Sequence, residues 1–136
     1  MKLRHGFFFA GLALVFCGWV LVSSPAVAEA RWGALAYNDR GATGLVWRRA
    51  SQAQAEQDAM DICARNATLP CRVVSGSGHA CIAATLAGQG NRQRGYATVR
   101  VGLNAARNAA LAACYGDGQT GCAIRNVLCA DGSHQP

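Results

Sequence analysis

The chain has 136 residues, of which 51% are hydrophobic and 15% charged, and its formal net charge is +6. This length fits one domain. The thirteen basic residues are scattered and no run interleaves them with aromatic residues, so we expect no specific nucleic-acid partner.

The first 28 residues have the three-part layout of a cleavable signal peptide. Residues 1–5 are basic, residues 7–22 form an apolar run, and an A-x-A site ends at Ala28. The run is short for a membrane span, which needs about 20 residues, so we expect no transmembrane anchor after cleavage. An uncleaved anchor and a lipid-modified Cys17 are the alternatives. We therefore predict an exported protein, periplasmic or secreted, whose domain begins near Glu29.

The rest of the chain begins with a predicted unit over residues 32–79. Its expected elements are a strand at 33–37, a turn at 38–41, a strand at 45–48, a helix ending at Cys63, a loop at 66–70, a strand at 71–74 and a flexible Gly- and Ser-rich turn at 75–79. Ser51 is the predicted helix N-cap, and Gln54 completes a capping box. Ala55, Ala59 and Ile62 fall at helical spacing and predict the buried face.

A second unit over residues 80–130 repeats this order. Its expected elements are a strand at 80–86, a polar turn at 88–95, a strand at 96–101, a helix at 104–114 and a strand at 122–129, followed by a flexible tail at 131–136. Ala106, Ala110 and Ala113 predict the inner face of the helix, and the segment 116–118 predicts its end.

One offset of 51 residues relates the two units. The matched pairs are Gly44 and Gly95, Arg49 and Arg100, Cys63 and Cys114, and Cys71 and Cys122. We therefore predict an α+β fold in which two duplicated β-β-α-β units, residues 32–79 and 80–130, form one disulfide-stabilised antiparallel-sheet domain with two helices. Helix faces lined by Ala bury little area, so disulfides are expected to supply stability.

The opening Trp32-Gly33-Ala34-Leu35-Ala36-Tyr37, together with the doubled unit of an Ala-rich helix ending in Cys, a short loop and a Cys-led strand, resembles the domain of unknown function 4189 family. The resemblance covers nearly the whole chain after residue 28 and implies the fold of exported bacterial domains. The chain departs from the family pattern at residues 48–49 and 91–94, where members are often rich in Gly and aromatic residues. The family has no established activity, so the resemblance implies no chemistry.

Six cysteines follow the predicted signal peptide, and an even count in a short exported chain predicts disulfides. No C-x-x-C pair is present, which disfavours zinc, and we expect neither a metal nor a cofactor. Equivalent cysteines should pair equivalently, which predicts Cys63–Cys71 and Cys114–Cys122 across loops of equal length. Cys81–Cys129 then remains and would link the two halves. It closes the longest loop, so it should stabilise most, by about 4 to 5 kcal/mol.

The sequence offers little catalytic machinery, and we predict that the protein is not an enzyme. His79 lies in the predicted turn at 75–79 and could form half of a hydrolase site with Ser75 or Ser77. An exposed loop histidine is the simpler interpretation.

Aromatic and arginine side chains are favoured anchors at protein interfaces. The candidate binding residues are Trp47, Arg48, Arg49, Arg92, Arg94, Tyr96 and Arg100. The alternative is one core Trp among solvated arginines.

We predict an exported non-catalytic protein that binds a protein partner, for example a periplasmic inhibitor or immunity protein. One alternative is a small secreted hydrolase or effector using His79 and a nearby Ser. Another is an envelope component that binds anionic glycan or lipid through Arg and is released by high salt.

Overall fold

The computed structural model describes residues 30–136, so the predicted signal peptide lies outside the described residues. Their elements are β1 (Trp32–Tyr37), β2 (Thr43–Arg49), α1 (Gln52–Arg65), β3 (Arg72–Ser77), β4 (Ala80–Ala87), the short 3-10 helix η1 (Gly90–Arg92), β5 (Arg94–Val101), α2 (Leu103–Gly116) and β6 (Ala123–Cys129). Neither α1 nor α2 is long and apolar enough to cross a membrane.

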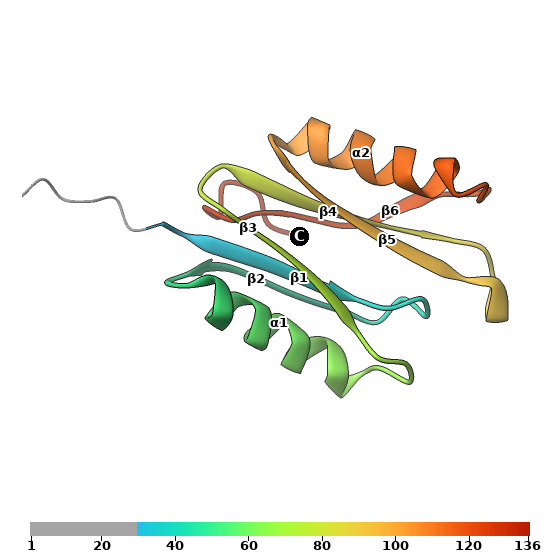
Figure 1. The fold of residues 1–136 in the computed structure, drawn as a ribbon, viewed down its shortest axis with the longest axis horizontal. Helices are drawn as coiled ribbons and strands as arrows, with labels where there is room; N and C mark the ends of the chain where they lie inside the picture. The colour runs from blue at the N-terminus through green and yellow to red at the C-terminus, as the bar shows by residue number, and fades with distance from the viewer. Residues whose placement is uncertain (1–29) are drawn as a thin grey trace, which may run out of the picture.

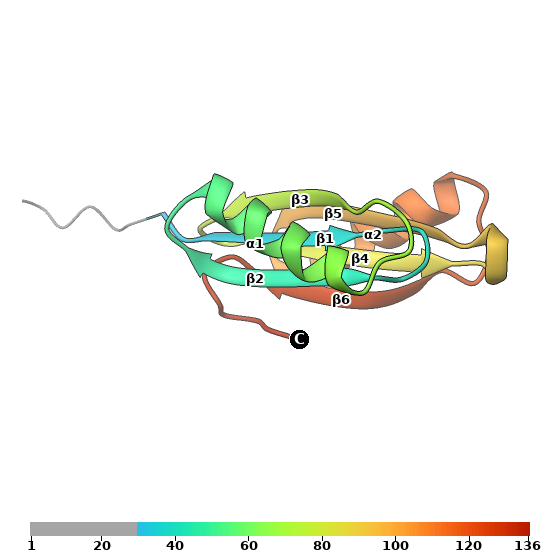
Figure 2. The same cartoon turned by 90° about the horizontal axis from the view of Figure 1, so that it is seen from below.

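The strands form two antiparallel sheets of three strands each. The first sheet has the order β2-β1-β3 and the second has the order β5-β4-β6. The sheets stack face to face, with α1 outside the first sheet and α2 outside the second (Figure 1). β3 and β5 lie along one edge of the stack, and β2 and β6 lie along the other (Figure 2). The prediction of an α+β fold with antiparallel sheets and two helices is confirmed.

The alternation of side chains along β1 and β4 builds three thin core layers. In β1, Ala34 and Ala36 pack under α1, whereas Leu35 points into the space between the sheets. In β4, Ala83 packs under α2 and Ile82 meets Leu35 between the sheets. Successive side chains of a strand point to opposite faces, so each central strand serves two layers and carries small residues where a helix approaches.

Both helices bury two alanines and one cysteine. The buried residues are Ala55, Ala59 and Cys63 of α1, and Ala106, Ala110 and Cys114 of α2. The prediction that Ala113 lies on the inner face was wrong: the buried line steps by four residues, so Cys114 takes that place and Ala113 is exposed. Ile62 is half-buried. Ser51 caps α1 as predicted, and its Oγ accepts a hydrogen bond from the Gln54 N–H at 3.2 Å.

The Gly- and Ser-rich segment 75–79 is mostly strand, which corrects the predicted flexible turn. Ser75 pairs with Ala34 and Ser77 pairs with Trp32, so β3 continues to Ser77 before a tight turn. Gly76 is required here by packing: a Cβ on it would lie 2.9 Å from the Val99 Cγ1 of the second sheet. Small residues in this segment thus allow the two sheets to come close together.

Three disulfides form, and they join the pairs that the sequence predicts. Cys63–Cys71 and Cys114–Cys122 each tie the end of a helix to the start of the next strand. The third bridge, Cys81–Cys129, does not link the two halves as predicted. Both residues belong to the second sheet, where they are register partners on β4 and β6.

An extra residue in β2 disturbs the match between the two halves. Trp32 pairs with Arg49 but Ala34 pairs with Val46, and Arg48 between them has a φ of 57°. A one-residue shift turns side chains to the opposite face of a sheet. Under the offset of 51, Arg49 of β2 and Arg100 of β5 therefore face equivalent sides of their sheets. The residues of β2 before the bulge face the side opposite to that of their counterparts in β5.

Gly44 and Gly95 illustrate that inversion. A Cβ on Gly44 would lie 2.1 Å from the Ala59 carbonyl oxygen of α1, and one on Gly95 would lie 2.8 Å from the Asn38 carbonyl oxygen of the other sheet. Matched glycines thus face a helix in one half and the sheet interface in the other.

The start of the predicted flexible tail is held against the domain. The Arg48 N–H donates to the Ala130 carbonyl at 3.0 Å, and the Cys129 N–H donates to the His134 carbonyl at 2.9 Å. These bonds join the C-terminal segment to both sheets.

Candidate functional site

The seven candidate binding residues do not form one surface. Three of them, Trp47, Arg48 and Arg49, lie on β2, and the other four lie on η1 and β5. β2 and β5 are at opposite edges of the stacked sheets (Figure 2). Arg100 also lies at the far end of β5 from Arg92, with its guanidinium 2.7 Å from the Val99 carbonyl.

The arginines on β2 serve internal contacts. Arg49 forms an ion pair with Asp58 of α1 at 2.6 Å. The Nε of Arg48 donates to the Asp131 carbonyl at 3.0 Å, which helps to hold the C-terminal segment. Trp47 is half-buried and lines a groove at the sheet edge with Ile62, so it is neither a core residue nor a fully exposed anchor.

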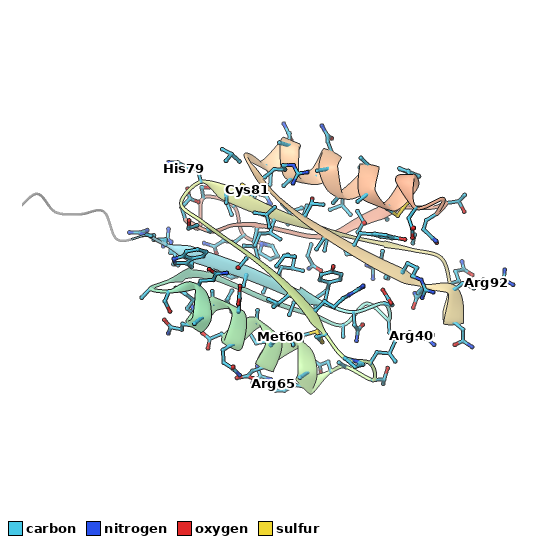
Figure 3. All side chains as sticks on the ribbon, viewed as in Figure 1. Arg40, Met60, Arg65, His79, Cys81 and Arg92 are labelled. Carbon is cyan, nitrogen blue, oxygen red and sulfur yellow. A yellow bond between two sulfur atoms is a disulfide. The ribbon has the colours of Figure 1, made fainter. Side chains whose placement is uncertain are left out.

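Arginines gather instead at the end of the molecule where the β1–β2 turn meets the β4–β5 connection. Arg40 and Arg92 lie at this end, whereas His79 lies at the opposite one (Figure 3). We call this surface the arginine-rich end. It comprises Arg40, Arg72, Arg92, Arg94 and Arg125.

Asp39 is the carboxylate around which part of this end is organised. Its Oδ1 accepts hydrogen bonds from Arg72 at 2.7 Å and from the Gly95 N–H at 2.9 Å. Its Oδ2 lies 3.8 Å from a guanidinium nitrogen of Arg94. The Arg72 guanidinium also lies 4.8 Å from the centre of the Tyr37 ring, a cation–π distance. Asp39 thus joins a turn of the first sheet to a strand of the second.

Arg40 makes a second bridge between the two halves. Its guanidinium donates to the Gly90 carbonyl and to the Asn91 Oδ1, both at 2.6 Å. The Asn38 Oδ1 accepts from the backbone N–H groups of Arg40 and Ala42, which fixes the turn as an Asx motif. These partners of the Arg40 guanidinium are neutral, so they orient its charge without cancelling it.

The balance of charge at the arginine-rich end is positive. Within residues 30–136, Arg40, Arg92 and Arg125 have no carboxylate oxygen within 4.0 Å, and Asp39 is shared by the other two arginines. Guanidinium groups held this way favour carboxylate, phosphate and sulfate partners.

Tyr96 of β5 and Asp117, which follows α2, flank this end. The Tyr96 hydroxyl donates to the Asp117 carboxylate. Burial, followed by that hydrogen bond, raises the pKa of Tyr96 to about 12. Tyr96 therefore remains a neutral donor at physiological pH and adds no negative charge to the surface.

The pocket that Arg125 lines at the arginine-rich end is small. The cavity between Asn38, Thr43 and Arg125 has a volume of about 10 Å³, which is room for about one water molecule.

His79 has a partner that the sequence did not predict. Its Nδ1 lies 3.0 Å from the Asp131 Oδ2, and its side chain is 89% exposed. Hydrogen bonds from Ser133, and then from His79, lower the pKa of Asp131 to about 2. The pair therefore contains an ionised carboxylate that orients the imidazole.

The predicted serine partners of His79 are placed differently. Ser75 donates to the Glu56 Oε1 at 2.6 Å, and this bond, with one from Gln52, holds the pKa of Glu56 below its usual value. Ser77 lies within β3, opposite Trp32. No cluster of three or more His, Cys, Asp or Glu side chains in residues 30–136 could hold a metal ion.

Arg40, Arg72 and Arg125 are not among the candidate binding residues predicted from the sequence because they are scattered along the chain. They lie 32 and 53 residues apart in the chain and share no motif. One signal was present: the offset of 51 matches Arg40 with Asn91, the residue that its guanidinium contacts. Equivalent turns of two stacked units can meet at the same end of the molecule.

These features define a small disulfide-stabilised α+β domain with two stacked sheets and an arginine-rich end. The family model "Domain of unknown function (DUF4189)" matches residues 32–129, and the chain belongs to this family, which confirms the resemblance noted in the sequence. No curated protein matches the chain. No solved structure matches it either.

Proposed function

We propose that the protein is an exported, non-catalytic binding protein whose arginine-rich end holds an acidic protein partner. An inhibitor or immunity protein directed against an exported enzyme fits this description. The observation that carries the proposal is the gathering of five arginines from separate segments at one end of the molecule, where Asp39 pairs with only two of them, Arg72 and Arg94.

The scaffold suits binding more than chemistry. Three disulfides make the scaffold rigid, and hydrogen bonds hold the Arg40 and Arg72 guanidinium groups in place, so these two side chains lose little conformational entropy when a partner docks. Charge complementarity at such a surface raises association rates and selects against basic partners.

Export and duplication are parts of the same proposal. Three disulfides are typical of proteins in oxidising compartments, which supports export to the periplasm or the exterior. The common order of strand, strand, helix and strand in each half, with matched helix-to-strand disulfides, supports duplicated units at residues 32–79 and 80–130. The bulge at Arg48 would then be a later divergence.

Two charge-reversal variants of equal net charge test the binding surface. Arg92→Glu with Arg125→Glu changes the arginine-rich end, and neither side chain donates a hydrogen bond within residues 30–136. Arg100→Glu with Arg107→Glu is the control away from that end. Each variant is immobilised as residues 29–136 and exposed to envelope and culture fractions of the host.

The proposal predicts one protein that wild type and the control retain and the Arg92/Arg125 variant loses. Purified, that protein should bind wild type at micromolar concentration or tighter and more weakly as salt rises. Equal retention by wild type and both variants would count against the arginine-rich end. Retention of anionic vesicles or acidic glycan in place of any protein would favour the envelope-component alternative.

The contact between His79 and Asp131 favours a second candidate function, a small hydrolase or effector. A carboxylate on Nδ1 orients an imidazole so that Nε2 can accept a proton from an attacking group. Ser75 is engaged by Glu56, so the nucleophile in this version would be Ser77 or water. A reproducible hydrolytic activity that His79→Ala abolishes and His134→Ala retains would establish this function and refute the binding-only proposal.

A further inference from the structure

A groove lies beside the arginine-rich end, between the last turns of α1 and the loop that follows. Met60 and Ala64 of α1 line one side, and Ala67, Leu69 and Pro70 of the loop line the other. Its volume is about 360 Å³, within the range of sites that bind organic groups. The walls are mostly apolar, so the groove suits a large apolar side chain.

The groove has a fixed shape and an exposed apolar wall. The Cys63–Cys71 bridge ties the end of α1 to the far end of the loop. The Asn38 amide donates to the Leu69 carbonyl at 3.0 Å and holds the middle of the loop. Leu69 itself remains 41% exposed, so part of its apolar side chain is open to a partner.

Two direct links place the groove next to the arginines. Asn38, which holds the loop, precedes Asp39 and Arg40 in the β1–β2 turn. Cys71, which lines the groove, precedes Arg72, and Arg72 contacts Asp39. The apolar groove therefore lies beside Arg72 and the β1–β2 turn, the part of the arginine-rich end that Asp39 organises.

We infer that the partner presents a large apolar side chain flanked by carboxylates, and that the groove takes the apolar group while the arginine-rich end takes the carboxylates. This inference rests on the proposed function and specifies the chemistry of its partner. Charge complementarity selects an acidic segment, and apolar anchors seated in pockets dominate binding energy at interfaces. A plain polyanion would use the arginines but leave Leu69 uncovered.

Three short peptides serve as ligands for residues 29–136 labelled with ¹⁵N. They are blocked pentapeptides with Trp between pairs of Glu, with Ala between pairs of Glu, and with Trp between pairs of Lys. The Trp–Glu peptide should bind at least about tenfold more tightly than the Ala–Glu peptide, which corresponds to about 1.4 kcal/mol. Its binding should shift amide signals of residues 67–69 and of Arg72 together. The Lys peptide should shift neither group.

Two matched variants locate the anchor. Leu69→Glu should reduce the affinity for the Trp–Glu peptide to that for the Ala–Glu peptide. Val101→Glu carries the same charge change at an exposed apolar residue, 78% accessible, at the end of β5, and should bind as wild type does.

Different failures have different meanings. Equal affinity for the two Glu peptides, with shifts confined to the arginine-rich end, would overturn the groove inference and leave the proposed function standing. Equal binding of the Lys peptide would show an apolar site without charge preference and overturn the inference. Concentration-dependent shifts at Leu69 without peptide would assign the groove to a second copy and also overturn it. No binding of either Glu peptide, with equal retention in the charge-reversal experiment, would reject both proposals.

Discussion

Removing the Cys81–Cys129 bridge should destabilise the protein more than removing either of the other two. The bridge closes a loop of 48 residues, whereas Cys63–Cys71 closes one of 8 residues. On the chain-entropy relation, these loop lengths correspond to about 4 kcal/mol and about 2.5 kcal/mol at 25 °C. Whole domains of this size are stable by about 5 to 15 kcal/mol, so the longer bridge accounts for a large share.

The measurement compares the free energies of unfolding of two double variants, Cys81→Ala/Cys129→Ala and Cys63→Ala/Cys71→Ala. Urea unfolding of residues 29–136 is monitored by circular dichroism. Both variants replace a bridge with two methyl groups. Cys81, Cys129 and Cys63 are buried and Cys71 is half-buried, so the difference reports loop length together with a smaller contribution from the second buried sulfur of the Cys81–Cys129 bridge. The expected difference is about 1.5 kcal/mol. A smaller loss for the Cys81/Cys129 variant than for the Cys63/Cys71 variant would refute the reasoning.

Three other predictions concern the core, the sheet–helix contact and pH. Leu35→Ala should cost about 3 kcal/mol in urea unfolding because Leu35 is fully buried between the sheets; a loss below about 1 kcal/mol would contradict that position. Gly44→Ala should cost about 1 to 3 kcal/mol or more, because the new Cβ would lie 2.1 Å from the Ala59 carbonyl, whereas Gly116→Ala, in open space in a helix, should be neutral or stabilising. Asp131 has a folded pKa of about 2, below its ordinary value of 3.8, so it adds stability above pH 3.8 that is lost as pH falls towards 2. Asp131→Asn should flatten the stability profile over that interval, and an unchanged profile would contradict the assignment.

Paired spacings in the sequence predicted the fold because each spacing had a direct structural cause. The interval of eight residues from Cys63 to Cys71 recurs from Cys114, and both intervals connect a helix end to a strand start. Ser51 carried a capping signal that depends on residues three apart, and it caps α1. Such signals are local, so a single chain is enough to find them.

Features that depend on contacts between the halves could not be predicted in the same way. The composition of residues 75–77 favours a turn, but pairing with β1 and the closeness of the second sheet at Gly76 make this segment a strand. The bulge at Arg48 adds one residue to β2, and residue propensities do not reveal such an insertion. The extra residue nevertheless turns the β2 side chains before it to the opposite face of the sheet. The assignment of Cys81–Cys129 as a link between halves was wrong for a different reason: both cysteines lie within residues 80–130, where they are register partners on β4 and β6.

The arginine-rich end exists only when both halves are docked. Its two bridges, from Asp39 to Gly95 and from Arg40 to Gly90, cross between sheets that no disulfide connects within residues 30–136. Asp39 also reduces repulsion between Arg72 and Arg94, which would otherwise oppose docking. Because the same contacts position the arginines and join the halves, a partner that binds this surface stabilises the junction of the two sheets. Binding at this end should therefore slow exchange of the Gly95 amide hydrogen, which bonds to Asp39, more than exchange of amides in α2, whereas equal slowing at both places would contradict a local effect at the junction of the two sheets.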